Sequence, residues 1–462
     1  MLTREQAQTV FDRIRNYSQA DETEVLIQGG RSALTRFANN TIHQNVAEEG
    51  YIVSIRALLD GKTARATTNK VDDESLKRAA ESAFTLARMQ ERDPDLLTMP
   101  APAEVHQARA WVNRQFAETS AVTPDDRAQA VEKIVRIAKK YRQTTAGIFS
   151  TAQQIEALIN SKGLAQFYEQ TSSEISITML GSDSSGWQKA NSPNVTNLNP
   201  EELAETAARK SVESAAPKEL SPGKYTVILE PAAVLDLIGF MFFDFGGAAL
   251  LEQRSFLNER LNTQLFGANI NIVDDVYHPL QSGAPFDGEG VPRQRVHLVQ
   301  NGVPGKLVYA RSTAHRIHNS EWTQKLGTVA ATGHGFPLPN DIGDAPMNIV
   351  FEGPAPADEK TVDEMVQSTE KGVLVTRLWY IREVDPYEKI LTGMTRDGTF
   401  LIEDGKLRYG IRNFRFNQSL IEMLKSAEQM GRPVRASGEE TFDMVVPAMK
   451  VRDFNFTEVT KF

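Results

Sequence analysis

The sequence contains no cysteine, and this absence removes several kinds of site at once. Disulfide bonds, thiolate metal ligands and cysteine nucleophiles are all excluded. No run of about 18 apolar residues is present that could cross a bilayer. Long basic runs are also missing, and a formal net charge of −9 offers no cationic surface for nucleic acid or anionic lipid. We therefore expect a cytoplasmic protein that binds neither nucleic acid nor membrane.

The sequence motifs of common hydrolases and nucleotide-binding enzymes are missing as well. The chain has no GxSxG for a serine triad, no HExxH for zinc and no GxGxxG for a dinucleotide. His315 and His318 are three residues apart, with Glu321 three residues further, so a helix would bring them close enough for one metal ion. The spacing supplies no further ligand, and solvated or hydrogen-bonded histidines are the plainer interpretation.

Two other positions could carry chemistry. His334 lies in the turn-like run Thr332–Gly335, where it could orient the backbone or touch a ligand. The pair Asp274-Asp275 follows an apolar run and could act as an acid/base or metal pair. Adjacent side chains of a strand point to opposite faces, however, so we favour a role for this pair in capping the end of a strand.

The length of 462 residues exceeds one ordinary hydrophobic core, so we expect two domains, with three as the alternative. In the run Ala215–Pro222, prolines and polar residues separate a predicted helix from a predicted strand, which is a composition typical of a linker. The predicted domains are therefore residues 1–215 and residues 216–462.

The first half of the chain mixes helical and strand patterns. Thr3–Ser18 places apolar side chains on one helical face, and Thr3 with Gln6 has the pattern of a capping box. Short strand-like runs follow between Gly-Gly, Asn-Asn and Glu-Glu-Gly breaks, and Asp60-Gly61 marks a hairpin. We expect a meander of strands from Thr144 to Ser182, a polar loop over Gly181–Asn199, and further helices over residues 72–92, 124–138 and 201–214. These patterns predict an N-terminal α+β domain with an antiparallel sheet.

The second half of the chain is richer in strands. Asn301-Gly302, Asp397-Gly398 and Asp404-Gly405 are the dipeptides of tight hairpin turns. A helix is predicted over Gln418–Gly431, because glycine followed closely by proline is typical of a helix end. Many antiparallel strands around few helices predict a β-rich C-terminal domain, built as a large sheet, barrel or sandwich. The predicted fold class of the whole chain is α+β.

The stretch Pro222–Asp275 opens the second half, and the rest of the chain is expected to be organised around it. It predicts a strand over Tyr225–Leu229, a helix opened by Pro231 and a break at Gly246-Gly247. Apolar residues recur at three- and four-residue steps in the predicted helix, which should therefore be buried on most sides. A hydrolase of this size would be expected to carry ligands here, yet the helix has no histidine, cysteine or serine.

Several segments together resemble the TldD/PmbA (TldE) family of metalloprotease-related proteins. They run through the chain in order, and the most specific is LVTRLWYIREVDPYEKILTGMTRDGTFLIEDGKL at 374–407. The others are shorter: residues 36–40 with 42–44, 255–257, 273–275, 301–303 and 332–334. The resemblance implies an N-terminal α+β domain, a C-terminal β-rich domain, and a two-subunit protease. Its TldD-type subunit is expected to carry zinc on a HExxxH helix, with a cysteine from the C-terminal segment.

This chain departs from the zinc-bearing pattern at each ligand position. The segment aligned with HExxxH reads Gly239–Asp244, GFMFFD, which lacks both histidines and the glutamate that would activate water. The C-terminal segment, RASGEE at 435–440, supplies no cysteine. Because a zinc site needs three protein ligands, the resemblance implies the metal-free TldE/PmbA type of subunit, with no metal, no cofactor and no catalytic residue of its own.

We therefore predict a non-catalytic subunit that pairs with a zinc-bearing TldD-type partner and helps to enclose unfolded or leader peptides, held as an added strand. Phe240, Phe243 and His334 are the predicted peptide or partner contacts, against the plainer interpretation that the phenylalanines fill a core. Two alternatives stay open. One is a self-sufficient hydrolase that uses His315, His318 or His334 with Glu321 or Asp274, and the other is a homodimeric peptide-binding or scaffold protein.

Overall fold

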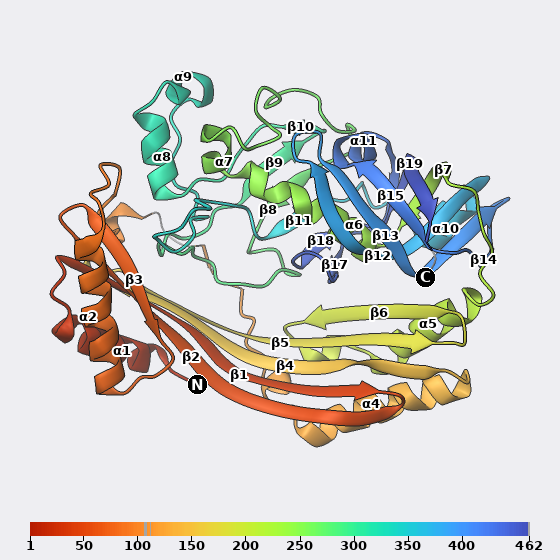
Figure 1. Ribbon diagram of the computed structural model, residues 1–462, viewed down its shortest axis with the longest axis horizontal. Coiled ribbons are helices and arrows are strands. Elements are labelled where there is room, and N and C mark those ends of the chain that lie inside the picture. The colour runs from red at the N-terminus through yellow and green to blue at the C-terminus, as the bar shows by residue number, and fades with distance from the viewer. Residues whose placement is uncertain (106–108, 111, 461–462) are drawn as a thin grey trace.

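A computed structural model describes residues 1–105, 109–110 and 112–460 (Figure 1). One six-stranded sheet is formed before residue 193, and two further sheets are formed after residue 222. The predicted α+β class, with a β-rich C-terminal part, is confirmed. Within the described residues, no helix combines the length and the apolar character needed to span a membrane.

The N-terminal sheet has the order β3-β2-β1-β4-β5-β6, and all neighbouring strands are antiparallel. Its strands are β1 (Glu22–Ala38), β2 (Thr41–Leu59), β3 (Lys62–Thr68), β4 (Thr144–Asn160), β5 (Ala165–Leu180) and β6 (Ser185–Ser192). The helices of this part are α1 (Arg4–Tyr17), α2 (Asp73–Met89), α3 (Ala117–Ser120), α4 (Pro124–Lys140) and α5 (Pro200–Glu213), with short 3-10 turns η1 (Pro102–Glu104) and η2 (Val195–Asn197).

One face of this sheet packs against helices in two separate places. Helices α1 and α2 cover one end with Val25 and Ile27 of β1, while α4 and α5 cover the other end with Phe37 of the same strand. The opposite face turns toward the C-terminal half of the chain (Figure 1), where Leu26 and Leu158 pack against Phe286. Between these apolar contacts the middle of the long, curved strands carries mostly polar side chains.

Several local predictions in this half are confirmed, and three are wrong. The capping box of Thr3 and Gln6 and the hairpin at Asp60-Gly61 are present. The Gly29-Gly30 pair does not separate two strands, because β1 runs straight through it with positive φ at both glycines. The Glu-Glu-Gly run at 48–50 is no break either, because it lies inside β2. Residues Gly181–Asn199 do not form one loop, since β6 pairs with β5 within them, and polar residues on a half-exposed strand explain this last error.

The C-terminal half contains two sheets and several short helices. Its strands are β7 (Gly223–Leu229), β8 (Ile272–Asp274), β9 (Val296–Gln300), β10 (Val303–Pro304), β11 (Ile349–Phe351), β12 (Lys371–Asp385), β13 (Ile390–Glu403), β14 (Lys406–Gly410), β15 (Phe414–Ser419), β16 (Ala427–Met430), β17 (Val434–Ala436), β18 (Met444–Val446) and β19 (Met449–Val459). Its helices are α6 (Pro231–Ile238), the 3-10 helix η3 (Gly239–Phe245), α7 (Gly247–Leu251), α8 (Arg311–His318), α9 (Trp322–Leu326), α10 (Val362–Gln367) and α11 (Leu420–Lys425).

Five strands of this half close into a barrel, because β12 pairs with both β7 and β13 while β19 and β15 complete the ring. The second sheet has the order β10-β9-β8-β11-β18-β17. Most pairings are antiparallel, as predicted, but β12–β7 and β11–β18 are parallel. The barrel and the sheet share one large core with α6 and η3. The stretch Pro222–Asp275, which contains these two helices, therefore lies at the centre of this half.

Two local predictions fail in the C-terminal half. Asp397-Gly398 is not a hairpin turn, because it lies inside β13. The Asp397 carboxylate forms an ion pair there with the Arg377 side chain of β12. The helix predicted over Gln418–Gly431 is limited to α11, because the chain then turns into β16 and pairs with β19. Tertiary strand pairing overrides the helical pattern at that point. The turns at Asn301-Gly302 and Asp404-Gly405 are confirmed.

Candidate functional site

The segment that the resemblance assigns to zinc binding is a helix that tightens before it ends. Glu230 donates its backbone N–H to Val375 of the barrel, and Pro231 opens α6 at the first helical position. At Gly239 the helix changes to the 3-10 form of η3, which ends at Gly246. The bulky run of η3 therefore continues a helix that begins at the end of a barrel strand, and it is held against the core.

The phenylalanines of η3 divide between the core and the surface. Phe242 and Phe245 are buried in the main core, with their ring centroids 6.1 Å apart. Phe240 is half-buried, and Phe243 is 45% exposed. Both of these side chains line a pocket of about 420 Å³ at the surface of the C-terminal half, together with residues of the β12–β13 turn and of the 440–442 segment. The prediction that the phenylalanines fill a core thus holds for one part of the run.

A buried lysine neutralises the carboxylate of η3. The Nζ atom of Lys389, which is only 3% exposed, lies 2.6 Å from Asp244 Oδ2 and 2.8 Å from Glu383 Oε1, and it donates to the Phe240 carbonyl at 3.4 Å. Burial raises the pKa of Asp244, and the lysine opposes that rise. One ammonium group therefore engages the acidic oxygens beside the pocket.

The C-terminal segment lies directly on α6. Asp236, which is buried, accepts hydrogen bonds from the backbone N–H groups of Glu439 and Glu440. An added Cβ at Gly239 would lie only 2.5 Å from the Thr441 side chain, so the two segments are in close contact. Burial raises the pKa of Asp236 to about 7, although these backbone donors lower it in part. The fold thus juxtaposes the two segments from which a zinc-bearing relative would be expected to draw its ligands.

The side chains at this junction do not fit a zinc ion. Zinc sites in proteins use histidine, cysteine and carboxylate groups in a tetrahedral set. Here the available donors are carboxylates, and two of them, Asp244 and Glu383, are held by Lys389. No group of three histidine, cysteine, aspartate or glutamate side chains placed to hold a metal ion occurs within residues 1–105, 109–110 and 112–460.

His334 and Asp274, which the sequence named as a candidate pair, do meet. His334 Nε2 lies 3.0 Å from Asp274 Oδ1, and His334 Nδ1 lies 3.0 Å from Thr332 Oγ1. The other carboxylate oxygen of Asp274 accepts the backbone N–H groups of Met347 and Asn348. The side chains of both His334 and Asp274 are fully buried. This arrangement ties strand β8 to neighbouring loops and presents no group to solvent.

The remaining sequence candidates lie on the surface. His315 and His318 are both on α8, as a shared metal site would need, but His315 Nε2 contacts the side chain of Asn319 at 3.0 Å. Glu321 is exposed just before α9. Of the three predicted contact residues, Phe240 and Phe243 share the pocket, whereas His334 is not among its lining residues. Sequence reasoning did not identify Lys389, whose partners are known only once the chain has folded.

Comparisons with known proteins agree along the whole chain. Residues 222–458 match the PmbA/TldA metallopeptidase C-terminal domain, and residues 23–87 and 117–215 match domain 1 and the central domain of the same description. Metalloprotease PmbA of Escherichia coli O157:H7 is 20% identical over 473 residues, covering 97% of this chain and 96% of that protein. TldE from Thermococcus kodakarensis superposes with a TM-score of 0.83 at 19% identity, over 98% of this chain and 100% of the other. A Thermotoga maritima protein described as a modulator of a DNA gyrase superposes with a TM-score of 0.80 at 20% identity, over 98% and 100% of the two chains.

Proposed function

This chain belongs to the PmbA/TldD metallopeptidase family, and we propose that it acts as a subunit without a catalytic metal of its own. In this proposal it pairs with a zinc-bearing TldD-type subunit, which supplies the activated water, and it helps to enclose an unfolded or leader peptide. The observation that carries the proposal is the junction of η3 with the 438–441 segment. Gly239 and Asp244 stand where the two histidines of HExxxH would be, and Phe240 stands where its glutamate would be. The carboxylates of Asp244 and Glu383 bind Lys389.

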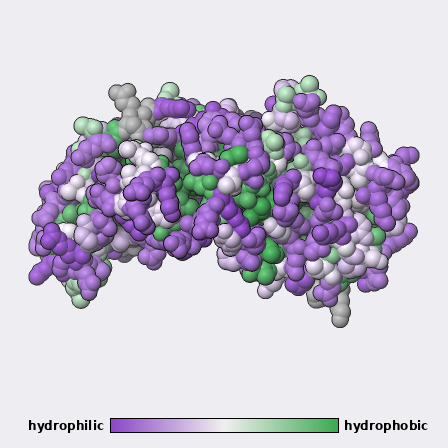
Figure 2. Space-filling model, turned by 90° about the horizontal axis from the view of Figure 1, so that it is seen from above, coloured by the Kyte–Doolittle hydropathy of each residue, from purple (hydrophilic) through white to green (hydrophobic). Residues whose placement is uncertain are grey.

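The surface beside this junction has the character of a partner contact. Four large apolar side chains at or near the pocket rim are exposed by 43% to 60%: Phe243, Tyr380, Val384 and Tyr387. Seen from above, the surface of the molecule is largely polar, with apolar residues gathered near its middle (Figure 2). Exposed apolar side chains that lie close together are typical of surfaces that bind another protein. We therefore assign Phe243 and the β12–β13 turn to the contact with the partner.

Reconstitution with a partner subunit tests this function. The isolated chain should bind no stoichiometric zinc and should leave an unfolded peptide intact, whereas its mixture with a HExxxH-bearing subunit should cleave the peptide and hold one zinc per pair. Replacing Phe243 and Val384 together by serine should weaken association at least about tenfold, as expected for apolar residues central to an interface. Peptide cleavage by the isolated chain, or zinc bound to it, would contradict the proposal.

A matched control separates a specific contact from a general loss of apolar surface. Leu86 is 43% exposed on α2, in the N-terminal half of the chain. Replacing Leu86 by serine together with Met89, which is 76% exposed at the end of the same helix, removes two exposed apolar side chains away from the pocket rim, so association with the partner should stay unchanged. No comparable contact supports the alternative hydrolase, because its best-formed pair, His334 and Asp274, is fully buried.

A further inference from the structure

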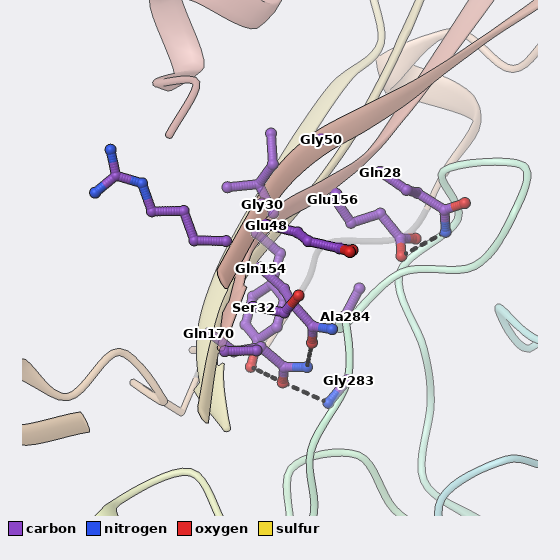
Figure 3. Close-up of a pocket in the computed structure, with 15 residues that line it drawn as sticks. Gln28, Gly30, Ser32, Glu48, Gly50, Gln154, Glu156, Gln170, Gly283 and Ala284 are labelled. Carbon is purple, nitrogen blue, oxygen red and sulfur yellow. Dashed lines mark hydrogen bonds between the residues drawn. The ribbon is translucent and has the colours of Figure 1, made fainter. Parts of the chain in front are cut away.

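Two glycines lie side by side in the middle of the N-terminal sheet, on the face that turns toward the C-terminal half. Gly30 of β1 pairs with Gly50 of β2 and with Gln154 of β4, and Gln154 pairs with Gln170 of β5. These four positions form a line across the strands, which we call the glycine trough. Two of its positions present only backbone, and a pocket of about 420 Å³ lies above it (Figure 3).

Carboxylates stand on both sides of the glycine trough. Two residues before Gly30, Gln28 pairs with Glu156, and two residues after it, Ser32 pairs with Glu48. Alternation along a strand puts all of these residues on the same face as the glycine. Figure 3 shows the Glu48 and Glu156 carboxyl groups pointing to the same side of the sheet as Gln154 and Gln170.

Neither carboxylate forms an ion pair with another described residue. Glu156 accepts a hydrogen bond from Gln28 Nε2 at 3.0 Å; burial raises the pKa of Glu156, and that hydrogen bond and the charge of Arg293 oppose the rise. Glu48 is exposed, and it forms no ion pair within the part of the chain that the structure describes. The one basic residue in the lining, Arg31, is bound to Glu49 at 2.7 Å. The pocket therefore holds two carboxyl groups that form no ion pair with the described residues, and a cation placed between them would favour the ionised form of Glu156.

The far end of the trough offers neutral hydrogen-bonding groups. Gln170 Oε1 accepts the backbone N–H of Gly283 at 2.9 Å, and Gln170 Nε2 donates to Gln154 Oε1 at 3.3 Å. A second pocket, of about 360 Å³, continues along the same face and shares Ser32, Ala152, Gln154 and Gln170 with the first. The cavity is thus elongated, and it is longer than a single side chain needs.

We propose that the glycine trough binds a lysine or arginine side chain of an extended polypeptide, whose neighbouring residues follow the second pocket. The bare backbone of Gly30 and Gly50 leaves room for the aliphatic stem of such a side chain. The cationic head then lies between Glu48 and Glu156, where charge-assisted hydrogen bonds are strong. The inference rests on the proposed function, because it names a property of the peptide that this subunit would hold.

Peptide binding to the isolated full chain tests the inference. The probe is a short fluorescent Gly-Ser peptide with one arginine, compared with the same peptide carrying neutral citrulline in its place. Fluorescence anisotropy should show at least about tenfold tighter binding of the arginine peptide, with the preference reduced at high salt. Glu48→Gln and Glu156→Gln should each weaken binding of the arginine peptide about fivefold or more and leave the citrulline peptide unaffected.

Matched variants make the result specific. Glu169→Gln removes one negative charge from the opposite face of β5, at an exposed position, and should not change binding. Gly50→Leu should abolish the preference for arginine by filling the trough, and circular dichroism checks that this variant folds. Equal binding of the two peptides, or full binding by both glutamate variants, would overturn the inference whatever happens at Gly50.

The source of the cation and the proposed function are tested separately. Spermidine should compete only weakly, because it does not extend along the second pocket, and competition as strong as that of the peptide would overturn the assignment to a polypeptide. The binding assay uses no partner subunit. Cleavage by the reconstituted pair with no arginine preference in the isolated chain would therefore refute the trough alone, while arginine-dependent binding without any partner activity would refute only the subunit role.

Discussion

The η3 segment and the glycine trough each have carboxyl groups beside a pocket, but they differ in whether those groups have a partner within the protein. In η3, Phe242 and Phe245 are buried in the core, and the Lys389 ammonium binds the carboxylates of Asp244 and Glu383 beside the pocket. In the trough, Gly30 and Gly50 leave the space open, and the carboxyl groups of Glu48 and Glu156 form no ion pair with any residue that the structure describes. The carboxylates beside η3 therefore stabilise the fold through an internal ion pair, whereas those beside the trough are available to a ligand.

This difference separates family membership from local chemistry. The fold brings the 438–441 segment onto α6, and the side chains that meet there are not those of a zinc site. A site is therefore defined by side chains and not by the backbone that carries them. Substitutions that reduce the filling of η3, or that fill the trough, test the contrast directly.

The largest effect is expected in the core part of η3. Phe242→Ala should lower the free energy of unfolding by about 3–5 kcal/mol, because it leaves a cavity beside Phe245 in a fully packed core. Phe243→Ala is the matched control on the same segment, and it should cost only about 1 kcal/mol because the side chain is 45% exposed. Urea denaturation measures both. Similar losses for the two variants would show that η3 is not divided between core and surface.

The next effect is a pH dependence at Asp236. Its pKa is raised to about 7 in the folded protein, against about 3.9 in an unfolded chain. Between these values the folded protein keeps a proton that the unfolded chain loses, so stability present at low pH is lost as the pH rises to about 7. The loss can reach about 4 kcal/mol for a shift of about three units.

Asp236→Asn should remove this loss, because the amide stays neutral and its oxygen can still accept the Glu440 N–H. The difference in unfolding free energy between the variant and the parent chain should grow in favour of the variant from pH 4 to pH 8. Comparing differences cancels the contributions of all other titrating groups, including Glu289, whose pKa burial also raises to about 7. A difference that does not change with pH would show that Asp236 is ionised throughout.

A smaller loss is expected when the lysine beside η3 is removed. Lys389→Met leaves Asp244 buried without its cation, which should cost about 3 kcal/mol, the lower end of the range for breaking a buried pair. Adding Asp244→Asn should recover part of that loss, since the neutral amide needs no counter-charge. A double-mutant cycle by chemical denaturation measures the coupling. Additive losses would mean that the interaction between Lys389 and Asp244 does not contribute to the free energy of unfolding.

Much of the fold could be predicted from the sequence, because local signals and tertiary structure agree over most of it. The capping box at Thr3, the hairpin at Asp60-Gly61 and the break at Gly246-Gly247 are all set by short-range chemistry. Predictions failed where long-range pairing decides, as in β16, which follows α11 inside a predicted helix. The closed barrel and its parallel pairing of β7 with β12 join segments 146 residues apart in register, as Thr226 and Gly372 show.

The candidate site was predictable in what it lacks and not in what it contains. The letters at 239–244 alone show that no histidine is present. The pairing of Lys389 with Asp244 spans 145 residues and leaves no local pattern. The glycines of the trough were visible, but Gly29-Gly30 and Gly50 looked like strand breaks. Their role depends on the register that puts Gly30 opposite Gly50, which single-strand patterns do not reveal.

The smallest effect is expected for substitutions in the glycine trough. A Cβ added at Gly50 meets no atom within 4 Å, whereas one added at Gly30, where φ is 150°, would lie 2.0 Å from the Gln153 carbonyl oxygen. Gly50→Ala should therefore change the unfolding free energy by less than about 0.5 kcal/mol, with a slight gain from the stiffer unfolded chain. Gly30→Ala should cost at least about 1 kcal/mol, because alanine rarely adopts that backbone conformation. Thermal denaturation of the two variants distinguishes them, and a marked loss at Gly50 would mean that the space above the trough is already filled by the protein itself.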